Sequence, residues 1–167
     1  MNMFKKEAEE ETQMNILSKD EFTDLIIQNK VSMYRLAMGI LKNKADAEDT
    51  VSETILIAYE HLYSLKDKTK FKSWMMTMLV NESKRVLKRR KRAVLCDNVD
   101  FFTGITEERN HEIWDLVLSL KEEFSQVVIL YYYEGFTTRE IAKILRISEG
   151  TVKSRLSRAR TKLKKLI

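Results

Sequence analysis

The chain contains no proline and only four glycines in 167 residues. Both residue types interrupt helices, so their scarcity favours long helices over short strands joined by tight turns. Cys96 is the only cysteine, which excludes an intramolecular disulfide and a cysteine-based metal site and fits a reducing cytoplasm. No stretch approaches the roughly 18 apolar residues that span a bilayer, and the start of the chain lacks the apolar core of a signal peptide. We therefore expect an all-α protein whose link to any membrane comes through another protein.

The two histidines, His61 and His111, stand apart from cysteine and from paired carboxylates at ligand or triad spacing. The sequence also lacks a glycine-rich loop that would cradle a phosphate group. These features argue against an enzyme, a resident metal, a cofactor and a small-molecule substrate. Both histidines are expected on helix surfaces.

The formal charge of the chain is +5 at pH 7 and its pI is about 9.2, which suggests an acidic partner. Acidic residues gather at 7–11, whereas two basic blocks occupy 84–92 and 153–165 on segments with a helical pattern. A single block of this kind is as often a solvated helix face as a binding surface. Two blocks, each beside a recognisable motif, indicate two contact points on a polyanion.

Capping signals and apolar stripes predict the helices of the first half. Ser18 and Glu21 form a capping box ahead of an apolar run, so a helix should begin there. Apolar residues at helical spacing predict three further helices, over about 33–41, 45–63 and 71–92.

The polar stretch 65–70, before the long helix, is too irregular for a core element. Phe71 and Trp74 lie on the apolar half of that helix and are expected in the core.

The pattern predicts two small helical domains. Residues 94–107 show no helical period and contain Gly104, so they are predicted to form a flexible linker. The acidic start has few apolar residues to offset its ordering entropy and is expected to be disordered. The predicted division is an N-terminal segment 1–17, a first domain 18–93, the linker 94–107 and a second domain 108–167.

The second domain carries a helix-turn-helix pattern. Thr137 and Glu140 form another capping box before a short helix, and Ser148 can cap the helix after the turn. Arg146 occupies a turn position where glycine is common, which carries a modest cost if the backbone takes a positive φ. One side of the second helix is apolar and is predicted to be buried; it consists of Val152, Leu156, Ala159, Leu163 and Leu166.

The opposite side of this helix is polar and cationic and is available to a DNA groove. A recognition helix presents its first turns to base edges and its flanking cations to phosphates. The base-side candidates are Lys153, Ser154, Ser157 and Arg158, whereas Arg155, Arg160 and Lys162 are expected to hold phosphates or face solvent. The whole predicted duplex-binding set is Arg139, Lys153, Ser154, Arg155, Ser157, Arg158 and Thr161. A basic helix in an ordinary helical hairpin is the plainer alternative.

Three ordered segments together closely resemble the extracytoplasmic-function sigma factors, the compact two-domain members of the sigma-70 family. Residues 46–59 are similar to region 2.2, residues 71–85 to regions 2.3 and 2.4, and residues 140–160 to region 4.2. The resemblance implies a sigma2-like helical bundle and a sigma4-like helix-turn-helix domain. One departure is Ser52, which stands where the family often has glutamine.

The resemblance also implies a division of contacts. Region 2.2 binds the β′ clamp helices of RNA polymerase, regions 2.3 and 2.4 open and read the -10 element, and region 4.2 reads the -35 element. The implied polymerase contacts are Asp46, Asp49, Glu53, Leu56 and Ile57. The implied -10 contacts are Lys66, Lys68, Asn81, Lys84, Arg85 and Lys88, with a pocket for a flipped base at 65–70.

The partners implied by the resemblance are the polymerase core, through its β′ clamp helices and β flap, promoter DNA, and an anti-sigma factor of the kind often anchored in a membrane. The chain is expected in the cytoplasm, held at the inner membrane surface where such an inhibitor binds it. A stand-alone helix-turn-helix regulator is the alternative, because other regulator families end in a pattern similar to residues 138–155. Such a regulator binds duplex DNA without polymerase, commonly as a dimer on two half-sites.

Overall fold

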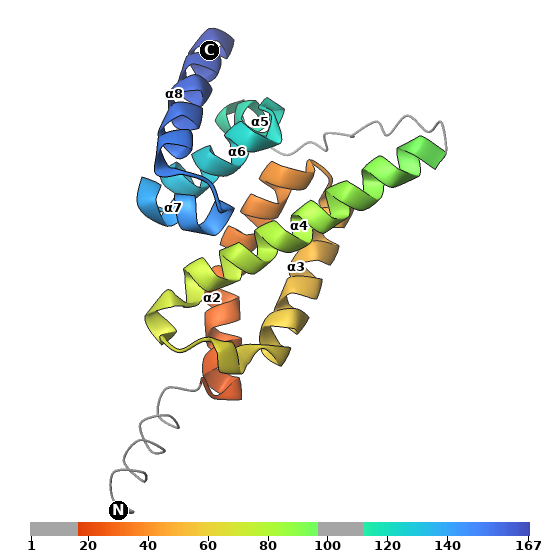
Figure 1. The fold of residues 1–167 in the computed structure, drawn as a ribbon, viewed down its shortest axis with the longest axis vertical. Helices are drawn as coiled ribbons and strands as arrows, with labels where there is room; N and C mark the ends of the chain where they lie inside the picture. The colour runs from red at the N-terminus through yellow and green to blue at the C-terminus, as the bar shows by residue number, and fades with distance from the viewer. Residues whose placement is uncertain (1–16, 97–111) are drawn as a thin grey trace, which may run out of the picture.

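The computed structural model describes residues 17–96 and 112–167, and within those ranges it contains only helices and connecting turns. The first range forms α2 (Lys19–Leu41), α3 (Lys44–Glu60) and α4 (Phe71–Cys96), with 3-10 turns at Leu62–Ser64 and Lys68–Lys70. The second range forms α5 (Glu112–Ser119), α6 (Glu122–Val128), the π-helical turn η3 (Ile129–Tyr133), α7 (Thr138–Leu145) and α8 (Glu149–Leu166) (Figure 1). The all-α prediction is confirmed for the described residues.

Both predicted helix starts are confirmed by their capping boxes. The Glu21 amide donates to Ser18 Oγ at 3.1 Å, and the Ser18 amide donates to Glu21 Oε2 at 2.8 Å. Thr137 and Glu140 make the same reciprocal pair at the start of α7. Two backbone donors at each helix start are therefore satisfied by side chains close in sequence.

The prediction of two helices between residues 18 and 41 is wrong, because α2 is one continuous helix over Lys19–Leu41. No glycine or proline interrupts the polar stretch in its middle. Asn29, buried at that point, donates from its side-chain amide to the Leu25 carbonyl at 2.8 Å. Its polar group is thus satisfied inside the helix, and the polar stretch does not break the element.

The fourth helix is longer than predicted. It continues to Cys96, so residues 94–96, assigned to the linker from sequence, are helical. Val94 and Leu95 are exposed there, which explains why no apolar period signalled the extension. Residues 1–16 and 97–111 lie outside the described residues. The predictions for the N-terminal segment, for the rest of the linker and for His111 fall in these two ranges.

The stretch 65–70 is partly a core element, contrary to the prediction, because Leu65 is buried. Phe71 is 2% exposed and meets Phe22 edge-on, with ring centroids 5.9 Å apart, so its expected core position is confirmed. Trp74 is partly buried against Phe71 at a centroid distance of 6.0 Å. These aromatic contacts fix the start of α4 against α2.

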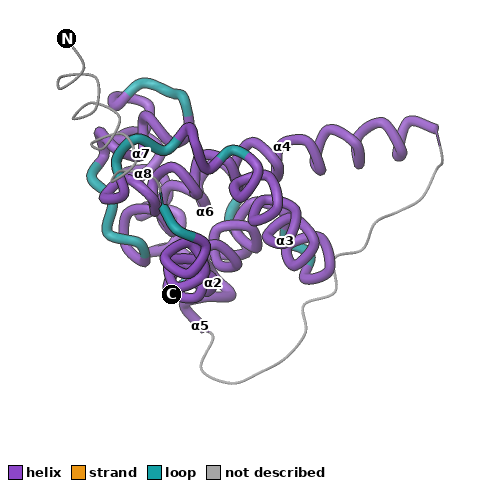
Figure 2. The backbone as a smooth tube through the Cα atoms, turned by 90° about the horizontal axis from the view of Figure 1, so that it is seen from below, coloured by secondary structure: helices purple, strands orange, loops and turns teal. Residues whose placement is uncertain are grey.

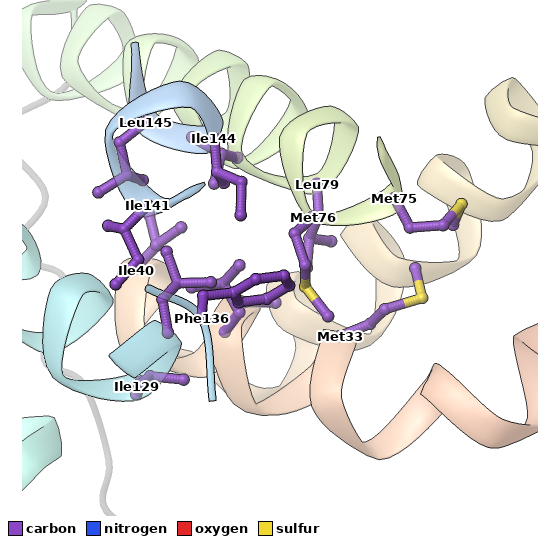
Figure 3. Close-up of a cluster of buried hydrophobic side chains, with 14 of the residues drawn as sticks. Met33, Ile40, Met75, Met76, Leu79, Ile129, Phe136, Ile141, Ile144 and Leu145 are labelled. Carbon is purple, nitrogen blue, oxygen red and sulfur yellow. The ribbon is translucent and has the colours of Figure 1, made fainter. Parts of the chain in front are cut away.

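The two domains lie against each other. In the first, α2, α3 and α4 pack pairwise; in the second, α8 packs on α6 and α7. Between them, α2 contacts α6 and η3, and α4 contacts α7, as two perpendicular views show (Figures 1 and 2). One continuous cluster of buried apolar residues runs across the boundary (Figure 3).

Candidate nucleic-acid interface

The helix-turn-helix is formed by α7, a tight turn and α8. Arg146 ends α7 with φ 53° and ψ 48°, so the left-handed conformation considered from sequence is present. The Ile147 amide donates to the Ala142 carbonyl at 3.0 Å, which closes the turn. Ser148 caps α8 by accepting from the Thr151 amide at 3.1 Å. Each of these features follows from residues within ten positions of the turn.

The inner side of α8 is buried as predicted over most of its length. Val152, Leu156 and Ala159 are all at most 3% exposed, and Leu163 is partly buried. The prediction for Leu166 is wrong, because its side chain is 53% exposed in the last turn. The apolar stripe of α8 therefore extends about one turn beyond the helices that cover it.

The outer side of α8 carries the polar set expected to meet a duplex. The exposed members are Lys153, Ser154, Ser157, Arg158 and Thr161. Ser154 and Thr161 donate to backbone carbonyls within the helix, so both hydroxyls also keep acceptor capacity for a ligand. Arg139 is exposed on α7.

Three cations of the second domain have partners at its surface. Arg155 is turned toward α6, where its Nη2 lies 3.7 Å from Glu123 Oε2, and its side chain is 23% exposed. Lys153 pairs with Glu149 at 3.1 Å, and Lys162 lies over the Phe124 ring at 5.6 Å. Arg155 is therefore less available to DNA than Arg158, although the sequence pattern placed both on the cationic side.

Glu149 orients the first turn of α8. It accepts from Thr138 Oγ1 at 2.7 Å, a bond that links the starts of α7 and α8. This bond, with the bond and charge from Lys153, holds the pKa of Glu149 below its usual value. The carboxylate therefore stays ionised to a lower pH than an unperturbed glutamate, and it keeps Lys153 beside the first turn.

On α4, three of the predicted -10 residues share one open face. These residues are Asn81, Lys84 and Lys88, whose three- and four-residue spacing aligns their side chains along the helix. Asn81 is half-buried, and the two lysines are exposed. Arg85 lies around the helix from them and pairs with Glu82 at 2.8 Å. Before α4, Lys66 is exposed and Lys68 Nζ pairs with Glu21 Oε1 at 3.0 Å.

A groove of about 390 Å³ lies between α3 and α4 at the surface. The predicted polymerase residues Asp46, Asp49 and Glu53 line its α3 side, and Asp46 is ion-paired with Arg90 of α4. Its α4 side has the spacing of one helix face and consists of Glu82, Arg85, Val86 and Arg89. Of these, Arg85 was predicted as a -10 contact, and the other three were missed from sequence. The groove thus joins the acidic flank of α3 to the basic half of α4.

The outer face of α3 combines acidic and apolar side chains. Glu53 is exposed, Ile57 is half-buried and Leu56 is 61% exposed. Tyr59 of α3 and Tyr63 of the 3-10 turn that follows were missed from sequence; they are 45% and 73% exposed. Exposed apolar residues gathered on one helix face indicate a protein interface.

Other kinds of site find little support in the described residues. No cluster of three or more histidine, cysteine or acidic side chains is arranged there to hold a metal. His61 is exposed, as expected, at the end of α3, with Nδ1 2.9 Å from the Ile57 carbonyl. Across residues 17–96 and 112–167, every helix is too short or too polar to cross a bilayer.

Two family models match the chain. The model described as Sigma-70 region 2 matches residues 25–93, and the one described as Sigma-70, region 4 matches residues 110–163. The first match spans α2 to α4, and the second spans the helix-turn-helix.

Curated relatives cover most of the chain. RNA polymerase sigma factor SigV of Bacillus subtilis is 32% identical over 138 residues, which cover 80% of this chain and 83% of that protein. ECF RNA polymerase sigma factor SigW of the same organism is 28% identical over 166 residues, which cover 88% and 89% of the two chains.

Solved structures share the fold. The sigma factor RpoE in complex with the anti-sigma factor NepR, from Bartonella quintana, matches with a TM-score of 0.81 and 25% identity, covering 89% of this chain and 97% of that one. CnrH, solved with the cytosolic domain of CnrY, matches in fold with a TM-score of 0.67 and 21% identity over 93% of both chains.

Proposed function

The chain belongs to the extracytoplasmic-function sigma factors of the sigma-70 family, and from that premise we propose how its surfaces divide the work of promoter recognition. As a sigma factor it directs core RNA polymerase to promoters. In this proposal α8 reads the -35 element, α4 holds the opened -10 element, and α3 docks on the polymerase. Its role is regulatory rather than catalytic.

The -35 assignment rests on the two sides of α8. The seam of Val152, Leu156 and Ala159 is buried, so the helix is fixed with its polar side outward. Arg158 and Ser157, near the middle of that side, are exposed and reach base edges in a major groove. Arg155 makes the lesser contribution, because Glu123 draws it toward the domain surface.

The -10 assignment rests on the open face of α4. Lys84 and Lys88 supply positive charge along the helix, and Asn81 supplies an amide that both donates and accepts. A melted strand needs a basic groove for its phosphates and a pocket for an unstacked base. The turn at 65–70, with Lys66 exposed, lies directly before this helix and is the proposed place for such a base.

The polymerase assignment rests on α3. Exposed ion pairs contribute roughly 0–1 kcal/mol each, so acidic residues alone do not hold a large complex. Leu56 supplies apolar area, and Glu53 and Asp49 beside it supply charge complementarity to a basic clamp. Asp46 has a smaller share, because Arg90 already neutralises it within the chain.

The proposed partners are core RNA polymerase, through its β′ clamp helices and β flap, promoter DNA and an anti-sigma factor. The last is supported by the complex of the Bartonella quintana sigma factor with its anti-sigma factor, whose sigma chain this protein resembles over both domains. Where such an inhibitor is anchored in a membrane, the chain would be held at the inner, cytoplasmic surface.

The observation that carries the proposal is the cationic face of α8, exposed beside a buried seam, in the same chain as the acidic and apolar face of α3. Run-off transcription from a cognate promoter with purified core polymerase tests it. Transcripts should appear only when the chain is added, and the chain alone should bind the duplex weakly. Strong, sequence-specific binding of the duplex without polymerase, together with no transcript, would support the stand-alone regulator instead.

A further inference from the structure

The boundary between the two domains is built like a protein core. Phe136, Ile141 and Ile144 of the second domain are buried against α2 and α4 of the first. In Figure 3, Phe136 lies beside Ile40 of α2 and Met76 of α4, with Ile141 and Ile144 close by. The apolar side of α7 is therefore covered by the first domain as well as by its own.

Gly39 lies where α2 packs closely against η3 and α6 of the second domain. A Cβ atom at this position would lie 2.2 Å from Ile129 Cδ1 and 3.7 Å from Ser125 Cβ. Glycine inside a helix costs about 1 kcal/mol relative to alanine, so its place in the last turn of α2 is unfavourable for that helix alone. The close packing of η3 on α2 accounts for it.

A buried carboxylate crosses the same boundary. The side chain of Glu134, 1% exposed, lies 2.5 Å from Arg35 Nη1 and 3.1 Å from Lys72 Nζ. Lys72 also donates to the Glu134 carbonyl at 3.1 Å. Arg35 belongs to α2 and Lys72 to α4, so one acidic residue of the second domain holds two helices of the first.

Each of these cations also lies over an aromatic ring of the second domain. Arg35 is 5.4 Å from the centre of the Tyr133 ring, and Lys72 is 5.4 Å from that of Phe136. Separation of the domains would therefore break two ion pairs and two cation–π contacts together.

We propose that Glu134, with Arg35 and Lys72, is a latch that closes the free sigma factor and must open before the promoter is bound. The -10 and -35 elements lie about 25 base pairs apart, roughly 85 Å along the duplex. The whole 26-residue α4 is only about 39 Å long, and α7 contacts it directly. The closed chain thus does not reach both elements, so the two domains must separate before both elements are bound.

The closure is tested by energy transfer in the free, full-length chain, without polymerase or DNA. Dyes are attached to Glu60→Cys and Lys164→Cys, two exposed positions on different domains, in a Cys96→Ser background. Glu134→Gln and Arg35→Gln remove the latch from either side, and Glu149→Gln is the matched control, since Glu149 pairs with Lys153 inside the second domain.

The labelled parent chain should show one high-transfer population. Each latch variant should raise the low-transfer population by roughly tenfold or more, and the control should not. Glu134→Gln removes both ion pairs across the boundary, and Arg35→Gln leaves the buried carboxylate with Lys72 alone. Circular dichroism checks that both domains keep their helices, and Arg35→Gln still reports if Glu134→Gln lowers helix content. A low-transfer free chain, or folded latch variants that stay as closed as the parent, overturns the proposal. The distance argument rests on the proposed function, but closure itself is measured independently of transcription.

Discussion

Arg158 is the side chain on which selectivity at the -35 element depends most directly. It is exposed in the middle of the outer side of α8, opposite the buried Leu156. Arg158→Ala should weaken binding of the holoenzyme to its promoter by about 1–3 kcal/mol, measured by titration of a labelled duplex. Lys162→Ala is the control, because Lys162 lies over Phe124. An equal loss on a scrambled -35 sequence would show that Arg158 touches only phosphate.

Lys42 makes the stability of the closed chain depend on pH. Its Nζ donates to Ser125 Oγ across the domain boundary at 2.5 Å, and burial lowers its pKa to about 8 despite the nearby charge of Glu122. An unfolded lysine titrates near 10.5, so between these values the unfolded chain binds more protons and stability rises with pH.

From pH 7 to 9.5 this side chain should add about 2 kcal/mol to the free energy of unfolding, measured by urea titration. Lys42→Met retains the apolar stem and should lack this increment. If the stability of the variant rises with pH as much as that of the parent, the assignment of the pH dependence to Lys42 is wrong.

Helix starts and the helix-turn-helix were predictable from sequence because their causes are local. The capping boxes, the turn at Arg146 and the buried seam of α8 each depend on residues a few positions apart. The continuity of α2 was missed, because the polar residues 28–30 separate its two apolar runs, and the bond from Asn29 to the Leu25 carbonyl is seen only in the structure. The length of α4 was missed, because its last turn is exposed and carries no apolar period.

The turn between α7 and α8 offers a test of backbone strain. Arg146 has φ 53°, a conformation that costs a side-chain-bearing residue roughly 1–2 kcal/mol and glycine almost nothing. Arg146→Gly should therefore be more stable than Arg146→Ala by about 1 kcal/mol in urea unfolding. The alanine variant separates relief of strain from loss of the arginine side chain. Equal stability of the two variants would rule out strain at this turn.

The outer face of α3 offers a test of polymerase docking. Glu53→Lys reverses an exposed charge beside Leu56, so the fold should persist while affinity for core polymerase falls by about 1 kcal/mol, roughly fivefold. Glu48→Lys is the control, because it makes the same change at an exposed position of the same helix about 140° around from Glu53, and it should leave the affinity unchanged. Fluorescence titration of labelled chain with core polymerase measures both. Unchanged affinity of the Glu53 variant would remove this residue from the interface.

At the scale of the whole molecule, the packing of the two domains was beyond reach from sequence. Glu134 reads as a solvated acid and Gly39 as a weak point in a helix, and neither signals its partner about a hundred residues away along the chain. Their roles depend on contacts between separate elements, which local spacing does not encode. The candidate surfaces were predictable because each lies on one helix. The ion pairs of Arg155 with Glu123 and of Asp46 with Arg90 were not, because each joins two different helices.

Transcription of fragmented genomic DNA by core polymerase, with and without this chain, tests the central claim most directly. Mapping of transcript 5′ ends should reveal a set of start sites that depend on the chain and share two sequence elements at a fixed spacing upstream. Arg158→Ala should weaken that set without creating a new one. Identical start sites with and without the chain would contradict the account.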